Sequence, residues 1–116
     1  MPTTALFIID IQAHLALSPT TSIPHAPRIL HAASTLLHKT RTTIASAVAA
    51  GSTPDVCIVF VQHEEIAEKG PLVRGSAAWE LAFRPREGEE TERLVGKNVR
   101  KCADLLFSPT NVLLEN

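Results

Sequence analysis

Residues 5–12, ALFIIDIQ, decide the fold class of this chain. Five apolar residues in a row are typical of a strand that is buried on both faces, as in a parallel sheet covered by helices. Asp10 follows directly and therefore lies at the carboxyl end of the predicted strand. In open α/β sheets, ligands bind and catalytic groups gather at that end. Asp10 is a candidate general base, and the alternative is that it only turns the chain after the strand.

A second strand and an intervening helix extend this pattern to a βαβ unit. Residues 55–61, DVCIVFV, are largely β-branched and apolar and precede a polar segment, which predicts another buried strand. Pro24 and Pro27 mark the start of a helix between the strands, and Gly51 marks its end. The two strands should be parallel, with a right-handed crossover. Apolar residues at helical spacing form one stripe: Ile29, Leu30, Ala33, Leu36, Leu37, Ile44, Ala47 and Val48.

The second half of the chain has a different character. Residues 63–92 are rich in Glu, Arg, Gly and Pro, which predicts a long connection of the kind that often forms a binding loop. Residues 92–95, ERLV, predict a short third strand, and residues 111–116 predict a last helix. Charges of both signs near the end of the connection predict a solvated surface with weak ion pairs. These charged residues are Arg84, Arg86, Glu87, Glu89, Glu90, Glu92 and Arg93.

Length and composition limit the possible classes of protein. With 116 residues, the chain forms one domain at most, and its net charge of −1 argues against nucleic-acid or anionic-membrane partners. No apolar run reaches membrane-spanning length, and no basic region precedes the first apolar segment. Cys57 and Cys102 are too few for a disulfide scaffold, so we expect a cytoplasmic location. His31 and His38 are seven residues apart, a spacing that does not favour a metal site.

Recognisable landmarks follow one another along the chain. They are the acid-x-Gln segment 10–12, the second strand 56–61, GSAAW at 75–79, PREGE at 85–89, LVGK at 94–97 and FSPTNV at 107–112. In this order they resemble the isochorismatase-like cysteine hydrolases, a family that includes isochorismatases, nicotinamidases and related small amidases, and the resemblance covers nearly all 116 residues. It implies a Rossmann-like three-layer α/β fold, with a parallel sheet between flanking helices, and no organic cofactor.

The family's chemistry combines an Asp base, a Lys that stabilises charge, and a Cys that attacks a carbonyl carbon. By resemblance, Asp10 takes the Asp role and Lys97 the Lys role. Lys101 is the alternative lysine, because its distance from the downstream FSPT segment fits the family spacing better. The expected substrate contacts are Gln12, His63 and Trp79. A structural role is the alternative for His63, and packing of the long connection is the alternative for Trp79.

The nucleophile is the missing part of this pattern. In the family the Cys lies well downstream of the Lys, and neither Cys57 nor Cys102 matches that position. Cys57 falls inside the second strand, where a buried and inert thiol is the expected outcome. The chain therefore predicts a single incomplete hydrolase domain over residues 1–116, truncated before the nucleophile and inactive alone. The intact protein would hydrolyse a small amide or a related C–N or C–O bond.

Two other hypotheses remain open from the sequence. In the first, the chain is a catalytically inactive short form that forms a homo-oligomer or binds a full-length homologue, because an incomplete sheet leaves an apolar edge exposed. In the second, it is a flavodoxin-like domain. The lack of a glycine-rich or Ser/Thr-rich phosphate loop after the first strand argues against that fold.

Overall fold

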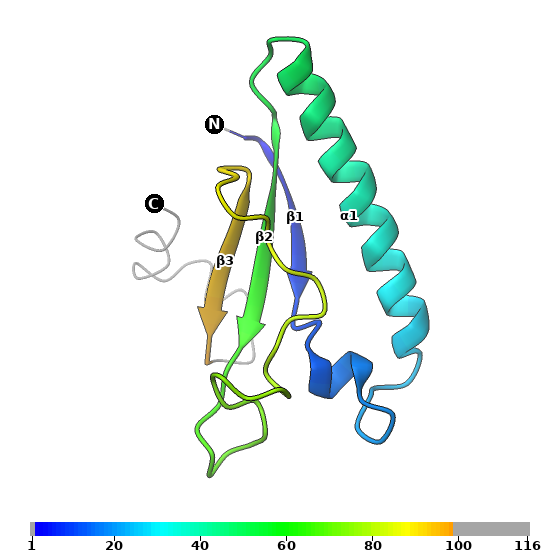
Figure 1. The fold of residues 1–116 in the computed structure, drawn as a ribbon, viewed down its shortest axis with the longest axis vertical. Coiled ribbons are helices and arrows are strands. Elements are labelled where there is room, and N and C mark those ends of the chain that lie inside the picture. Colours follow the sequence, from blue (N-terminus) through cyan, green and yellow to red (C-terminus); the bar gives the residue numbers. More distant parts are fainter. Residues whose placement is uncertain (1, 99–116) are drawn as a thin grey trace.

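The computed structural model describes residues 2–98, which form a parallel three-stranded sheet with one long helix against it (Figure 1). The strands are β1 (Thr4–Ile9), β2 (Val56–His63) and β3 (Glu92–Lys97), in the order β1-β2-β3. Helix α1 (Ala26–Ala49) connects β1 to β2, and a short π-helical turn, η1 (Ala13–Leu17), precedes it. The predicted α/β class and the parallel βαβ unit are confirmed.

The strand ends differ slightly from the prediction, and the difference matters for the site. Strand β2 continues to His63 and β3 continues to Lys97, so these two residues are paired in the parallel register. Strand β1 ends opposite Val61, one residue before Asp10. The carboxyl ends of all three strands therefore lie at the same end of the sheet, which is called the carboxyl edge below. The predicted helix over 111–116 lies outside the described residues.

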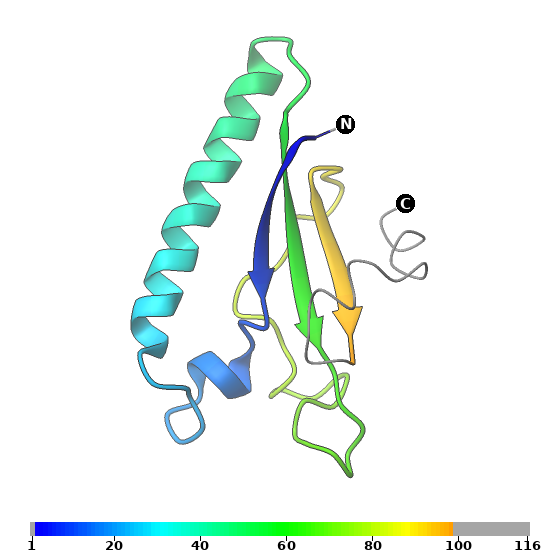
Figure 2. The same cartoon turned by 180° about the vertical axis from the view of Figure 1, so that it is seen from behind.

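The main core lies between α1 and one face of the sheet. The two opposite views show α1 running along the sheet on the side of β1 (Figures 1 and 2). Apolar side chains alternate along β1 and β2, so every second residue faces the helix. Burying each of these side chains contributes about 1.5–3 kcal/mol. The buried members of this core are Ile8, Leu37, Ile44, Ile58, Phe60 and Leu81.

The opposite face of the sheet carries a smaller cluster, so the expectation that β1 is buried on both faces is wrong for the described residues. In that cluster Val61 and Val95 are buried and Phe7 and Val59 are partly buried. In β1 only Ile8 is buried. The reason is that α1 covers a single face.

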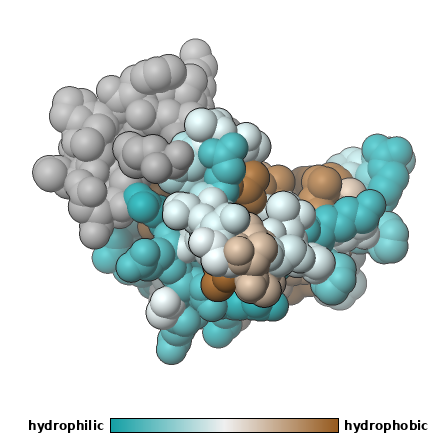
Figure 3. All heavy atoms as spheres, turned by 90° about the horizontal axis from the view of Figure 1, so that it is seen from above, coloured by the Kyte–Doolittle hydropathy of each residue, from teal (hydrophilic) through white to brown (hydrophobic). Residues whose placement is uncertain are grey.

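The predicted helix stripe is also too wide. Leu36 and Val48 are 51% and 60% exposed, whereas Ala33, Leu37 and Ile44 are buried. One helix contacts only a narrow strip of the sheet, and residues at the margins of its apolar face remain in solvent. Seen from above, brown apolar surface lies among white and teal residues (Figure 3). Within residues 2–98, no helix is long and apolar enough to cross a membrane.

The end of α1 depends on the backbone of Gly51. This residue has a φ of +77° and its N–H donates to the carbonyl of Val48 at 3.0 Å. A Cβ at Gly51 would meet no atom within 4 Å. The cost of a side chain at this position therefore comes from the positive φ and not from a steric clash with neighbouring residues. Gly51→Ala should therefore lower the free energy of unfolding by about 1 kcal/mol.

Urea denaturation of Gly51→Ala and of a matched control, Gly96→Ala, tests this expectation. Gly96 lacks a positive φ, and an added Cβ would approach only Glu64 Oε1, at 3.7 Å. The control should therefore keep or raise the free energy of unfolding, by at most about 1 kcal/mol, because alanine restricts the unfolded chain without strain in the folded one. Equal losses in the two variants would contradict the backbone explanation.

Candidate active site

A sharp turn after β1 places Asp10 at the carboxyl edge of the sheet. Asp10 has a φ of 56°, in the left-handed region that Asp and Asn tolerate better than most residues. Its N–H donates to the carbonyl of Val61 at 2.9 Å, and its own carbonyl accepts the N–H of Gln12 at 3.1 Å. The backbone of Asp10 is therefore bonded on both sides, which fixes where its side chain begins.

Asp10, Lys97 and His63 form one polar cluster at this edge. Lys97 Nζ lies 2.9 Å from Asp10 Oδ2 and 3.2 Å from His63 Nδ1. The Lys97 side chain is 1% exposed and the Asp10 side chain 28%. A buried ammonium requires such partners, because burial without them is costly. The second carboxylate oxygen, Asp10 Oδ1, is buried and has no hydrogen-bond partner within residues 2–98.

A cavity of about 360 Å³ adjoins this cluster. Its volume is at the lower end of those typical for small-molecule sites. The lining combines the three cluster residues with apolar and polar side chains from η1 and from the long connection after β2. The lining residues are Asp10, His14, Leu15, His63, Glu65, Pro71, Leu72 and Lys97.

The wall formed by the connection is held by hydrogen bonds and an ion pair. The Glu65 N–H donates to the carbonyl of Leu72 at 2.8 Å, and the Leu72 N–H donates to Glu65 Oε1 at 3.3 Å. Beside it, the exposed guanidinium of Arg74 contacts both carboxylate oxygens of Glu64, at 3.0 and 2.8 Å, which raises the pKa of Arg74. These contacts close the segment into a compact loop.

Gln12 has a different place from the substrate contact expected from the sequence. It is fully buried, and its side-chain amide bonds to the backbone of two other segments. Its Nε2 donates to the carbonyls of His63 and Trp79, at 2.9 and 2.7 Å, and its Oε1 accepts the His63 N–H at 2.9 Å. Because these groups are already paired, Gln12 supports the site and does not offer its amide to a ligand.

The other predicted site residues are placed as follows. Trp79 is not among the described residues that line the cavity, and its carbonyl accepts hydrogen bonds from Gln12 and Gln62. Lys101, the alternative lysine, and Cys102 lie outside the described residues. Cys57 lies at the start of β2, about six residues or 20 Å from His63, and lines a separate groove.

Some cavity residues were not predicted. His14 and Leu15 belong to η1, which has no periodic signal in the sequence, while Glu65 belongs to the polar segment that follows β2. The only sequence signal for Glu65 was that it follows a buried strand, at the end of the sheet where ligands bind in this type of fold. In the part of the chain that the structure describes, no three His, Cys, Asp or Glu side chains group in a way that could hold a metal ion.

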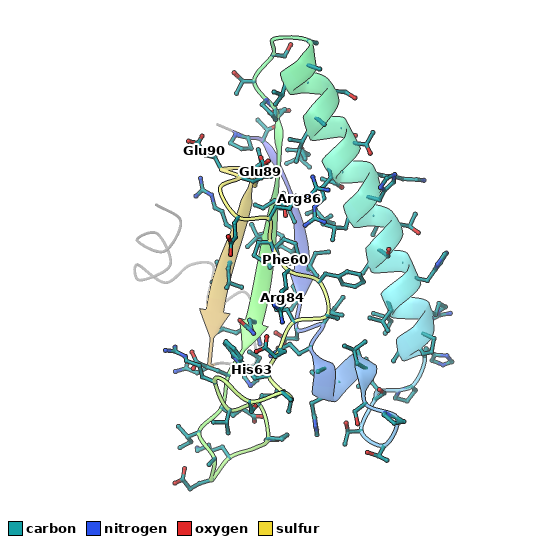
Figure 4. All side chains as sticks on the ribbon, viewed as in Figure 1. Phe60, His63, Arg84, Arg86, Glu89 and Glu90 are labelled. Atoms are coloured by element: carbon teal, nitrogen blue, oxygen red, sulfur yellow. The ribbon has the colours of Figure 1, made fainter. Side chains whose placement is uncertain are left out.

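Glu92 corrects the expectation of a solvated charged cluster before β3. Its side chain is 3% exposed and forms a two-pronged ion pair with Arg41 of α1, at 2.6 and 2.9 Å. The Arg86 N–H also donates to Glu92, at 3.0 Å. Burial acts to raise the pKa of Glu92, but the hydrogen bonds from Arg41 and Arg86 outweigh it, and the pKa is lowered. The other labelled charges of that cluster, Arg84, Glu89 and Glu90, are exposed (Figure 4).

Comparison with known proteins gave one structural similarity. A crystal structure from Burkholderia xenovorans LB400, of a protein provisionally identified as an isochorismatase, aligns with a TM-score of 0.42 and 26% sequence identity. The alignment covers 84% of this chain and 42% of that one, so the present chain spans less than half of its length. No protein-family model matches this chain, and no curated protein matches it.

Proposed function

We propose that this chain is part of an isochorismatase-like hydrolase that acts on a small amide or a related C–N or C–O bond. The observation that carries the proposal is the contact of Lys97 Nζ with Asp10 Oδ2 at 2.9 Å beside a small cavity. The sequence resemblance assigns the base and the charge-stabilising roles to these two residues. Their meeting at the carboxyl edge of a parallel sheet supports that assignment.

In the proposed reaction, Asp10 accepts the proton of the nucleophile, a thiol or a water molecule. The nucleophile then bonds to the carbonyl carbon, and the Lys97 ammonium stabilises the negative charge that develops there. The C–N bond breaks, and the departing nitrogen takes up the proton held by Asp10. With a thiol nucleophile, water then hydrolyses the thioester. Among residues 2–98 no cysteine lies at the cavity, so a thiol must come from outside them.

Asp10→Asn is the sharpest test of this proposal, because Asn tolerates the positive φ of residue 10 while it removes the carboxylate that serves as the base. In an active full-length form that contains this chain, we expect turnover to fall by about 10²–10⁴-fold. The assay measures ammonia release from benzamide and nicotinamide and pyruvate release from isochorismate. Asp55→Asn is the matched control, since Asp55 is exposed and precedes the start of β2, at the opposite edge of the sheet.

The control should keep full turnover. Its carboxylate accepts hydrogen bonds from Thr3, chiefly from the hydroxyl at 2.7 Å, and these lower the pKa of Asp55 without any contact with the cavity. Retained turnover in Asp10→Asn would contradict the role of Asp10. Absence of turnover in the unmodified full-length form would contradict the hydrolase function and favour the second candidate function.

The second candidate is a catalytically inactive form that binds a second copy or an intact relative. The observation in its favour is an open groove of about 360 Å³ on the sheet face opposite α1, lined in part by Phe7, Cys57, Val59 and Val95. Within the described residues, β1 and β3 are the two outer strands of the sheet, and each has one side without a neighbouring strand. Light scattering and co-purification with a full-length homologue test this candidate. A stable monomer with amidase turnover would refute it.

A further inference from the structure

His63, which lines the cavity, is held both by its backbone and by its ring. Gln12 bonds both its N–H and its carbonyl, each at 2.9 Å, so the backbone of His63 is fixed at the end of β2. Its ring is fixed separately by Lys97, its neighbour in the sheet register. In Figure 4, His63 lies at the end of β2, where the chain leaves the sheet.

The contact with Lys97 decides which ring nitrogen carries the proton. A lysine ammonium has only donors, so His63 Nδ1, 3.2 Å from Lys97 Nζ, must accept. The proton of a neutral imidazole then resides on Nε2. Lys97 remains the donor because its ammonium is also paired with Asp10. A proton on Nδ1 would place two donors against each other.

His63 Nε2 has no hydrogen-bond partner among residues 2–98, and His63 lines the cavity together with Asp10 and Lys97. We infer that Lys97 keeps His63 as the neutral Nε2–H tautomer and that this N–H orients the ligand by donating to a carbonyl or carboxylate oxygen. That this ligand is the substrate rests on the proposed hydrolase function. The site then favours molecules that bring an oxygen acceptor to the cavity over those that bring only donors.

Nuclear magnetic resonance of the ¹⁵N-labelled full chain tests the tautomer directly. We expect the His63 ring, assigned by the loss of its signals in His63→Gln, to show the neutral Nε2–H pattern at pH 7.5. Lys97→Met should replace that pattern by an exchanging mixture, because the donor at Nδ1 is lost. Asp55→Asn leaves both Lys97 and its partner Asp10 in place and should keep the pattern. A proton on Nδ1 in the unmodified chain would overturn the inference.

Ligand binding tests the donor role and requires no turnover. Benzamide supplies a carbonyl oxygen, and benzylamine is a similar molecule without one. His63→Phe should weaken benzamide binding roughly fivefold, the worth of one hydrogen bond, and leave benzylamine binding unchanged. His63→Gln should restore benzamide binding, because its amide can accept from Lys97 and still donate to the ligand.

His38→Phe is the control, since His38 is exposed on α1 and is not among the residues that line the cavity. An equal loss of benzamide binding in His38→Phe, or no loss in His63→Phe, would overturn the donor role. Failure of this inference can be distinguished from failure of the proposed hydrolase function. An Nε2–H tautomer with selective benzamide binding but no hydrolysis contradicts only the enzyme, whereas hydrolysis with the wrong tautomer contradicts only this inference.

Discussion

Arg41→Met is expected to lower the free energy of unfolding by about 3–5 kcal/mol, the largest effect of any single change considered. Methionine fills a similar volume but leaves the Glu92 carboxylate, 3% exposed, without its charged partner. The loss of the Arg41 Nη2 bond to the carbonyl of Arg84, at 3.1 Å, also frees the segment that precedes β3. Urea denaturation at pH 7 measures the effect.

Arg28→Met is the control for Arg41→Met, because Arg28 is an exposed arginine on the same helix. It should change the free energy of unfolding by less than about 0.5 kcal/mol. Similar losses in both variants would mean that the helix, and not the buried pair, is sensitive to the substitution.

The buried pair also sets a pH dependence. The pKa of Glu92 is lowered from its ordinary value of 4.5, so the folded state favours the ionised carboxylate. The stabilisation from the pair is therefore complete above the unfolded pKa and is lost as the pH falls through the folded pKa. The stability difference between the unmodified chain and Glu92→Gln should shrink below about pH 4.5. A difference that stays constant between pH 7 and pH 3 would contradict this assignment.

Gln12→Leu is expected to cost about 3 kcal/mol of folding stability and to loosen the candidate site at the same time. Leucine fills the space but leaves the His63 N–H and carbonyl buried without the amide that now bonds them. The Trp79 carbonyl loses one of its two donors. Urea denaturation gives the energy, and hydrogen exchange at the His63 amide reports the local loosening.

Gln62→Leu is the matched control for Gln12→Leu. Gln62 is also a buried glutamine and donates to the same Trp79 carbonyl at 3.0 Å, but this is a single bond. The control should cost about 1 kcal/mol and leave the exchange of the His63 amide unchanged. Losses of the same size in both variants would show that burial, and not the three-bond network, determines the role of Gln12.

The sequence predicted the elements whose signals are local. Residues 5–9 and 56–61 are unbroken apolar runs, and residues 26–49 have a helical period, so β1, β2 and α1 were placed within a few residues. Asp10 and Lys97 were assigned their roles by resemblance to the hydrolase family, with Lys101 as the alternative lysine, and the structure brings the side chains of Asp10 and Lys97 into contact.

The features that the sequence did not predict depend on contacts between distant segments. Nothing local to Glu92 distinguishes it from its exposed neighbours, because its partner Arg41 is 51 residues away on α1. The bonding of Gln12 likewise depends on where two later segments return to β1. The helical period of residues 26–49 also predicts which face of the helix is apolar. It does not predict how much of that face the sheet will cover, and Leu36, at the margin of the face, remains exposed.

The pairing of His63 with Lys97 in the sheet register links assembly of the site to folding of the last strand. A slip of β3 by one residue would turn Lys97 to the other face of the sheet and bring Gly96 or Asn98 opposite His63. In the slipped register Lys97 therefore cannot contact Asp10 or His63, and no register lies between the two. The fraction of molecules with a Lys97–Asp10 contact therefore cannot exceed the fraction in which β3 pairs with β2 in the correct register, and a ligand that binds the assembled cavity stabilises that register selectively.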